Sequence, residues 1–150
     1  MEEKTKNLSS KIPKEVSHVT DALEKAGFEA YLVGGCVRDL LLGKEPKDWD
    51  VATNAKPDQI IGLFEKTVYE NEFGTVGVVV SRETTPPLTV EVTPFRLEAK
   101  YSDFRHPDHV LFSDKIEDDL KRRDFTVNAM SYRKNAVMDI YDGLKDIKDI

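Results

Sequence analysis

The chain has little cysteine and no long hydrophobic run. Its only cysteine in 150 residues is Cys36, so no disulfide can form within the chain, as is typical of a reducing compartment. No apolar stretch approaches the roughly 20 residues that a transmembrane helix needs. Residues 1–11 are polar and charged and lack the apolar stretch of a signal peptide. These absences predict a cytoplasmic protein without a membrane partner, in which Cys36 is a small packing residue.

Positive charge is also scarce. The 22 Lys and Arg residues stand against 28 Asp and Glu, and the net charge of −6 excludes a wholly basic nucleic-acid-binding module. Any contact with nucleic acid must therefore use a local basic patch. No Cys/His zinc site, Walker loop or Ser-His-Asp set is present, and His18 and His109 have no partner set. The length and the 39% hydrophobic content fit one ordinary globular domain.

Helix and strand signals alternate along the chain, which predicts an α/β fold with a mixed sheet. Helices are expected from Pro13 to Gly27, at 36–42, from Pro57, at 114–123 with Asp114 as its cap, and at 125–132. Strands are expected at 30–33, 49–53, 74–81, 88–93 and 137–141. Residues 98–108 show no clear period and are predicted to form a long loop.

Asp48 and Asp50 flank Trp49 at the start of a predicted strand. Because side chains alternate along a strand, both carboxylates are expected on one face, with Trp49 in the core. Mg²⁺ prefers such hard oxygen ligands and completes its coordination with water and substrate phosphates. The pair therefore predicts a metal site, although Asp-x-Asp pairs also occur in ordinary surface turns.

Gly34 and Gly35 stand where the predicted strand turns into a helix. Backbone N–H groups at such a turn can bind phosphate, and Arg38 lies one turn into the helix, where its guanidinium could join them. The simpler interpretation is a turn that needs glycine, with Arg38 in a surface ion pair. The nearby metal pair favours a phosphate site, because the two together could act on a nucleoside triphosphate.

Two acidic or mixed segments could add to this site. Glu91 alternates with valines in a predicted strand and could supply a third carboxylate, or could simply line the solvated face of an edge strand. Asp103 and Arg105 lie in the predicted long loop, which could act as a lid. His106 in the same loop fits a participant in the site and a passive loop residue equally well.

A basic segment follows at residues 122–128. Arg123, Asp124 and Asn128 could bind a triphosphate and a ribose, because arginine suits phosphate and the other two suit hydroxyl groups. Alternatively, Arg122 and Arg123 could pair with acidic residues one turn earlier in the predicted helix.

Taken together, these stretches resemble the catalytic head of the bacterial tRNA nucleotidyltransferases, the class II CCA-adding enzymes, whose head is shared by bacterial poly(A) polymerases. The similarity runs from about residue 12 to the end of the chain. The matching stretches are YLVGGCVRDLLLG at 31–43, KDWDVAT at 47–53, FGT at 73–75, VEVTPFR at 90–96 and DLKRRDFTVNAM at 119–130.

The resemblance implies a polymerase-beta-like nucleotidyltransferase fold, with a small mixed sheet flanked by helices. It implies addition of CMP or AMP from CTP or ATP to a tRNA 3′ end by two-metal in-line displacement, with release of pyrophosphate. By the family pattern, Asp48 and Asp50 hold two Mg²⁺ ions and Glu91 is a third catalytic carboxylate. The pattern assigns nucleotide binding to Gly34, Gly35, Arg38, Arg123, Asp124 and Asn128, and a flexible loop to Asp103 and Arg105.

The chain departs from the family in length. The family continues into a helical neck, where a Glu-Asp-x-x-Arg motif reads the incoming base, and into later regions that grip the tRNA. We therefore expect a fragment with a flexible lead-in at 1–11, the catalytic head at 12–141 and the start of a neck at 142–150. Such a chain should bind Mg²⁺–NTP with little base preference and add nucleotides to RNA weakly or not at all.

Three alternatives stay open. A poly(A) polymerase head would extend generic RNA, which product length would reveal. A catalytically idle nucleotide-binding or assembly domain is disfavoured by the intact Asp48, Asp50 and Arg123-Asp124. A small antibiotic-modifying or toxin–antitoxin nucleotidyltransferase usually carries Gly-Ser before its carboxylate pair, where this chain has Gly34-Gly35. The number of nucleotides added and the oligomeric state are not fixed by the sequence.

Overall fold

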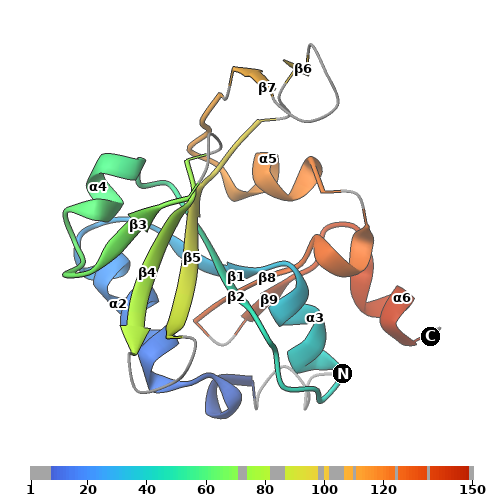
Figure 1. The fold of residues 1–150 in the computed structure, drawn as a ribbon. Helices are drawn as coiled ribbons and strands as arrows, with labels where there is room; N and C mark the ends of the chain where they lie inside the picture. The colour runs from blue at the N-terminus through green and yellow to red at the C-terminus, as the bar shows by residue number, and fades with distance from the viewer. Residues whose placement is uncertain are drawn as a thin grey trace.

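A mixed seven-stranded sheet with helices on both faces forms the centre of the chain (Figure 1). The computed structural model describes residues 8–70, 74–81, 87–97, 100–101, 107–109, 111–123, 125–134 and 136–148. The expected α/β fold class is confirmed. Within the described ranges, no helix has the length and apolar character needed to cross a membrane.

The sheet is antiparallel except at one pair of strands. Its order is β3-β4-β5-β2-β1-β8-β9, and only β2 and β5 run parallel. The strands are β1 Ala30–Val33, β2 Trp49–Thr53, β3 Thr67–Tyr69, β4 Val76–Ser81, β5 Leu88–Pro94, β8 Ser131–Arg133 and β9 Ala136–Met138. A separate hairpin of β6 (Lys100–Tyr101) and β7 (Pro107–His109) projects beyond one end of the sheet (Figure 1).

Among the described residues, five α-helices and two 3₁₀-helices accompany these strands. They are η1 Leu8–Lys11, α2 Lys14–Lys25, α3 Gly35–Leu41, α4 Pro57–Ile61, α5 Ile116–Lys121, η2 Thr126–Asn128 and α6 Gly143–Lys148. The predicted helices after Pro13, at 36–42 and after Pro57 are confirmed within one or two residues at their ends.

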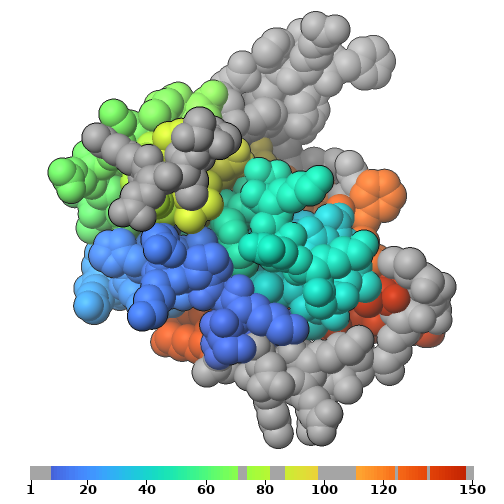
Figure 2. Space-filling view, turned by 60° about the horizontal axis from the view of Figure 1, so that its bottom comes forward, coloured from blue at the N-terminus to red at the C-terminus, as the bar shows by residue number. Residues whose placement is uncertain are grey.

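The larger hydrophobic core lies between one face of the sheet and helices α2 and α3. Helix α2 places Val16, Val19 and Leu23 on this core at helical spacing, and all three are fully buried. Trp49 is buried in the same core, as predicted. Leu8 of η1 completes it, and Figure 2 shows this N-terminal segment (blue) packed against the teal segment that follows α3.

A smaller core on the opposite face fixes helix α5. It consists of buried residues from β1, β2, α5 and the residue after β5: Tyr31, Val33, Ala52, Phe95, Ile116 and Leu120. Because side chains alternate along a strand, the residues that do not face the larger core face α5 instead. Asp50 and Glu91 are on this side, since Val51 and Val92 beside them belong to the larger core.

The predicted cap of α5 is wrong. The N-cap position is Lys115 rather than Asp114, and Asp114 is exposed. Ser113, which is buried, takes the turn-forming role instead: its Oγ accepts the Lys115 N–H (3.0 Å) and donates to Asp118 Oδ2 (2.5 Å). A buried hydroxyl competes better for these groups than a solvated carboxylate does.

The predicted helix at 125–132 is also wrong, because these residues form η2 and then the strand β8. Phe125 is 66% exposed, whereas Met130 and Tyr132 are buried in the larger core, and pairing of β8 with β1 fixes an extended backbone that the β-favouring residues here can adopt. The last predicted strand ends early, at Met138, because Asp139 turns to accept the N–H groups of α6. The loop predicted at 98–108 is wrong for β6 and for the first two residues of β7, which pair as a short hairpin.

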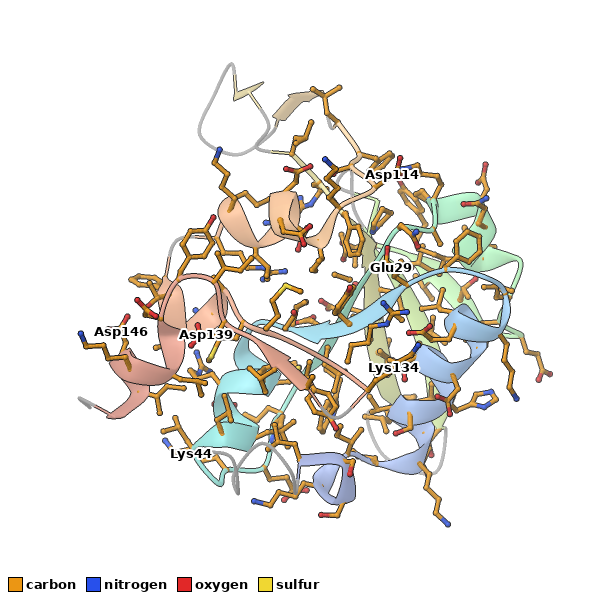
Figure 3. The ribbon with its side chains drawn as sticks, turned by 180° about the vertical axis from the view of Figure 1, so that it is seen from behind. Glu29, Lys44, Asp114, Lys134, Asp139 and Asp146 are labelled. Carbon is orange, nitrogen blue, oxygen red and sulfur yellow. The ribbon has the colours of Figure 1, made fainter. Side chains whose placement is uncertain are left out.

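Two carboxylates labelled in Figure 3 hold helix α6: Asp139 at its start, and Asp146 within it, which bonds to η2. Asp139 accepts from the N–H groups of Gly143 (2.6 Å) and Leu144 (2.9 Å) and so caps the helix. Asp146 accepts a hydrogen bond from the hydroxyl group of Thr126 in η2. The short segment 126–128 is thereby held in place from the C-terminal side.

Arg133 links the end of β8 to the end of α2. Its Nε and Nη2 donate to the two carboxylate oxygens of Glu24 at 2.7 and 2.9 Å, and its Nη1 donates to Glu29 (3.3 Å). Figure 3 labels Glu29, which is one of these acceptors, and Lys134, which follows Arg133 in the chain. The hydrogen bonds from Arg133 hold the pKa of Glu24 below its ordinary value of 4.5.

Arg133→Met is expected to lower the free energy of unfolding at pH 7 by about 1–2 kcal/mol, because a partly buried, charge-assisted pair is lost. A carboxylate with a lowered pKa stabilises the fold above its unfolded pKa and ceases to do so as it becomes protonated. The difference from wild type should therefore shrink as the pH falls below about 4.5. Urea denaturation at pH 7 and at pH 3.5 measures the loss of unfolding free energy and its decrease at low pH. The control is Lys44→Met, which removes an exposed cation. An undiminished difference at pH 3.5 would contradict the ionic origin.

Candidate active site

Asp50 and Glu91 are direct neighbours across the parallel strands β2 and β5. Asp50 is half-buried, Glu91 is exposed, and Asp48 lies in the exposed bend that precedes β2. Burial first, and then the Glu91 carboxyl within hydrogen-bonding reach, raise the pKa of Asp50 to about 7, while Arg123 opposes this shift and Asp48 adds to it. The structure therefore brings the three predicted carboxylates together.

A fourth carboxylate, Glu70, lies next to Glu91, and sequence patterns did not single it out. Glu70 follows the short strand β3, and burial together with the charge of Glu91 raises its pKa. Gly77 pairs with Glu91 in register, and a Cβ at Gly77 would lie only 2.6 Å from Glu70 Oε1. A glycine inside a valine-rich strand is the signal that could have indicated this close approach.

Three of these carboxylates, Asp48, Glu70 and Glu91, border an open cavity of about 420 Å³. Its lining residues are Lys47, Asp48, Trp49, Glu70, Pro87, Leu88, Thr89 and Glu91. Crowded carboxylates on a solvent-accessible cavity fit a hard divalent cation, which would offset their mutual repulsion. In the part of the chain that is described, no three His, Cys, Asp or Glu side chains already converge on one ion position. A bound Mg²⁺ would thus have to draw these side chains together.

Gly34 brings the β1–α3 turn against this acidic group. Its backbone has φ +76° and ψ −142°, a conformation that favours glycine. A Cβ at Gly34 would lie 3.4 Å from Arg123 Nη1 and 3.8 Å from Asp50 Oδ2. The turn, the guanidinium and the carboxylate therefore meet at one place. The Arg123 Nε–H is buried and finds no acceptor among the described residues, and the Nη1 of the same guanidinium is the atom that faces the turn.

Arg38 is held in a defined position over the same turn. Its Nη1 donates to Asn128 Oδ1 (2.9 Å) and its Nε donates to Asp39 Oδ1 (3.1 Å). Its Nη2 lies 3.1 Å from where a Cβ at Gly35 would stand, so the guanidinium packs directly on the glycine backbone. Asn128 thus contacts a predicted phosphate-binding side chain, and its predicted contact with a sugar stays a prediction.

Three predicted site residues lie outside the described residues: Asp124, Asp103 and Arg105. The other eight lie on two adjoining patches: Asp48, Asp50, Glu91, Gly34 and Arg123 on one, and Arg38 and Asn128 on the other with Gly35 between them. The alternative interpretation of the basic segment also holds in part, because Arg122 and Arg123 both pair with Asp119 of α5.

Comparison with known proteins connects this arrangement to one family. Residues 30–150 match the family model described as the poly A polymerase head domain. A CCA-adding enzyme of Leuconostoc mesenteroides is 50% identical over 128 residues, which cover 84% of this chain and 31% of that protein. The chain spans about a third of the length of the curated relatives it matches.

Solved structures of similar proteins belong to the same group of enzymes. The crystal structure of the Bacillus stearothermophilus CCA-adding enzyme in complex with CTP superimposes with a TM-score of 0.76 at 36% identity, covering 90% of this chain and 31% of that one. A tRNA nucleotidyltransferase complexed with a primer tRNA and an incoming ATP analog gives a TM-score of 0.63 at 29% identity, covering 87% of this chain and 36% of that one.

Proposed function

Because this chain belongs to the poly A polymerase head domain family, we propose that it is the catalytic head of a template-independent RNA nucleotidyltransferase. The head would transfer CMP or AMP from CTP or ATP to the 3′ end of tRNA and release pyrophosphate. The names of the relatives, CCA-adding enzymes, and the CTP complex of one of them support this substrate class. The observation that carries the proposal is the adjacency of Asp50 and Glu91 beside the Gly34 turn and Arg123.

Each group of residues has a role in this proposal. Asp48 and Asp50, with Glu91, would hold Mg²⁺, which when bound lowers the pKa of a hydroxyl nucleophile and offsets the charge of a leaving pyrophosphate. Arg123, beside Asp50, would bind an oxygen of the triphosphate through its remaining donors. Arg38, fixed by Asn128 and Asp39, would bind another. Both guanidinium groups are oriented before the substrate arrives, which is how positioning contributes to rate.

The remaining nucleophile near the site is unsuited to chemistry. Cys36 is buried, its Sγ donates to the Val33 carbonyl oxygen at 3.2 Å, and burial raises its pKa to about 11. A thiol that stays protonated at neutral pH is a poor nucleophile. The proposed reaction needs no protein nucleophile, because the hydroxyl group of the RNA attacks the nucleotide directly.

We further propose that residues 12–141 form the head and that 142–150 begin a helical neck.

Binding of Mg²⁺–CTP and Mg²⁺–ATP, measured by calorimetry, tests the proposal. We expect a Kd below about 1 mM for both nucleotides, with little preference between bases. Binding should require Mg²⁺ and weaken at least about 100-fold in Asp48→Ala/Asp50→Ala, because the metal would lose its ligands.

The matched control is Asp58→Ala/Glu65→Ala, which removes two exposed carboxylates and leaves the candidate site intact. Equal affinities of wild type and control, together with the loss in the double variant, would place the nucleotide at Asp48 and Asp50. Absence of binding at millimolar nucleotide, or unchanged binding in the double variant, would contradict the proposal. Primer extension on tRNA lacking its 3′ end, compared with generic RNA, then distinguishes the tRNA from the poly(A) activity.

A further inference from the structure

Asp119 in helix α5 carries a buried carboxylate to which the sequence patterns assigned no role. Its exposed fraction is 1%. Its Oδ1 accepts from the backbone N–H of Arg96 (3.2 Å) and from Arg122 Nε and Nη2 (3.3 and 3.2 Å). Its Oδ2 accepts from Arg123 Nη2 (3.1 Å). A buried charge is tolerated when opposite charges and hydrogen bonds surround it in this way.

The hydrogen bond to Arg123 leads directly to the candidate active site. Arg123 Nη2 is held by Asp119, while Nη1 of the same guanidinium lies 3.4 Å from the Cβ position at Gly34. Asp50 Oδ2 lies 3.8 Å from that same position. One rigid, planar guanidinium group therefore bridges the buried carboxylate and the site.

The backbone around Asp119 is held by packing and by a hydrogen bond. Leu120, next to Asp119, is fully buried in the smaller core with Phe95, and Asp119 accepts the backbone N–H of Arg96 just after it. Asp119 is thus attached both to α5 and to the chain that leaves β5. The strand that carries Glu91 and the helix end that precedes Arg123 are connected through a single carboxylate.

We propose that Asp119 is a positioning residue, which holds the Arg123 guanidinium over the Gly34 turn in the orientation that a nucleotide triphosphate requires. The proposal rests on the proposed nucleotide-binding function. An arginine side chain with four rotatable bonds would otherwise have to be ordered when the ligand binds, at an entropic cost. The hydrogen bond to Asp119 orders the Arg123 side chain when the protein folds. Removal of Asp119 therefore weakens binding without removing any group that touches the ligand.

A double-mutant cycle in the full 150-residue chain tests this role. The variants are Asp119→Asn, Arg123→Met and the two combined, with Mg²⁺–ATP affinity measured by calorimetry. Asp119→Asn is expected to weaken binding about 10–100-fold, the usual effect of removing an outer positioning partner. In the Arg123→Met background the same change should have no further effect, because Asp119 acts through Arg123. Glu117→Gln, an equal charge change at an exposed position of α5, is the control and should leave affinity unchanged.

Independent, additive losses from the two substitutions would overturn the proposal, since they would show that Asp119 only stabilises α5. A second measurement needs no variant: the NMR order parameter of the Arg123 Nε–H in the ligand-free wild type. We expect a value above about 0.8, and a value below about 0.6 would overturn the proposal even if Asp119→Asn fails to fold. If wild type binds no Mg²⁺–ATP, the proposed function fails, whereas this order parameter still decides whether Arg123 is fixed.

Discussion

Asp50→Asn is expected to raise the melting temperature of the metal-free protein by roughly 4–8 °C at pH 8, which corresponds to about 2 kcal/mol for a domain of this size. In wild type, the half-buried Asp50 carboxylate lies beside Glu91 and near Asp48. Asparagine has nearly the same shape, removes one of these like charges and can donate its amide N–H to Glu91. Groups arranged for function commonly reduce stability in this manner.

The size of this gain should depend on pH. An acid whose pKa is raised on folding contributes its full stability below the unfolded pKa and loses it as the pH rises through the folded pKa. For Asp50 this window runs from its ordinary value of 3.8 to about 7. The melting temperatures of wild type and Asp50→Asn should therefore nearly coincide at pH 4 and differ most at pH 8.

Magnesium should reverse the order of the two proteins. A ligand that binds only the folded state at 100 times its Kd stabilises it by about 2.7 kcal/mol, so MgCl₂ should raise the melting temperature of wild type, and EDTA should cancel the rise. Asp50→Asn should respond little. Asp58→Asn, an exposed carboxylate on α4, is the control and should behave as wild type does. A magnesium response that persists in Asp50→Asn would show that the ion binds elsewhere.

Phe95→Ala is expected to lower the free energy of unfolding by about 3–5 kcal/mol, a large part of the 5–15 kcal/mol typical of a domain. Phe95 is fully buried, and its ring centroid lies 6.0 Å from that of Tyr31. It belongs to the smaller core together with the buried residues Ile116 and Leu120 of α5. Truncation would leave a cavity at the contact that fixes this helix to the sheet.

Urea denaturation measures this loss as a lower midpoint with an unchanged slope. Leu97→Ala is the matched control, because Leu97 lies two residues further on and is 39% exposed; its cost should stay below about 1 kcal/mol. A loss at Phe95 no larger than that of the control would show that the smaller core contributes little.

Because Arg123 follows α5, Mg²⁺–ATP affinity should fall with Phe95→Ala even under conditions where the variant is fully folded.

The sequence patterns predicted those parts of the fold and site that depend on local rules. Alternation placed Asp50 and Glu91 on the face away from Val51 and Val92, and the glycine pair marked the turn after β1. What alternation could not supply was the pairing of β2 with β5, since strand order depends on contacts between segments far apart in the chain. The structure adds this pairing, and with it the contact between the two carboxylates.

The remaining features required tertiary context. β3 and β8 have three residues each, too few for a periodic pattern. The Arg38–Asn128 hydrogen bond joins residues 90 positions apart. Asp119 could be placed one turn before Arg123 from its spacing, but only the packing of α5 shows that its carboxylate is buried.

The parallel pairing of β2 and β5 has a consequence for the order of folding. The intervening chain forms β3 and β4, so this pairing closes a long loop and belongs to the slow, non-local steps of the process. A slip of one residue in β5 would also turn Glu91 into the larger core and two valines out to water, which strongly penalises any register except the native one. A partly folded chain therefore lacks the contact between Asp50 and Glu91, which forms only when β2 and β5 pair.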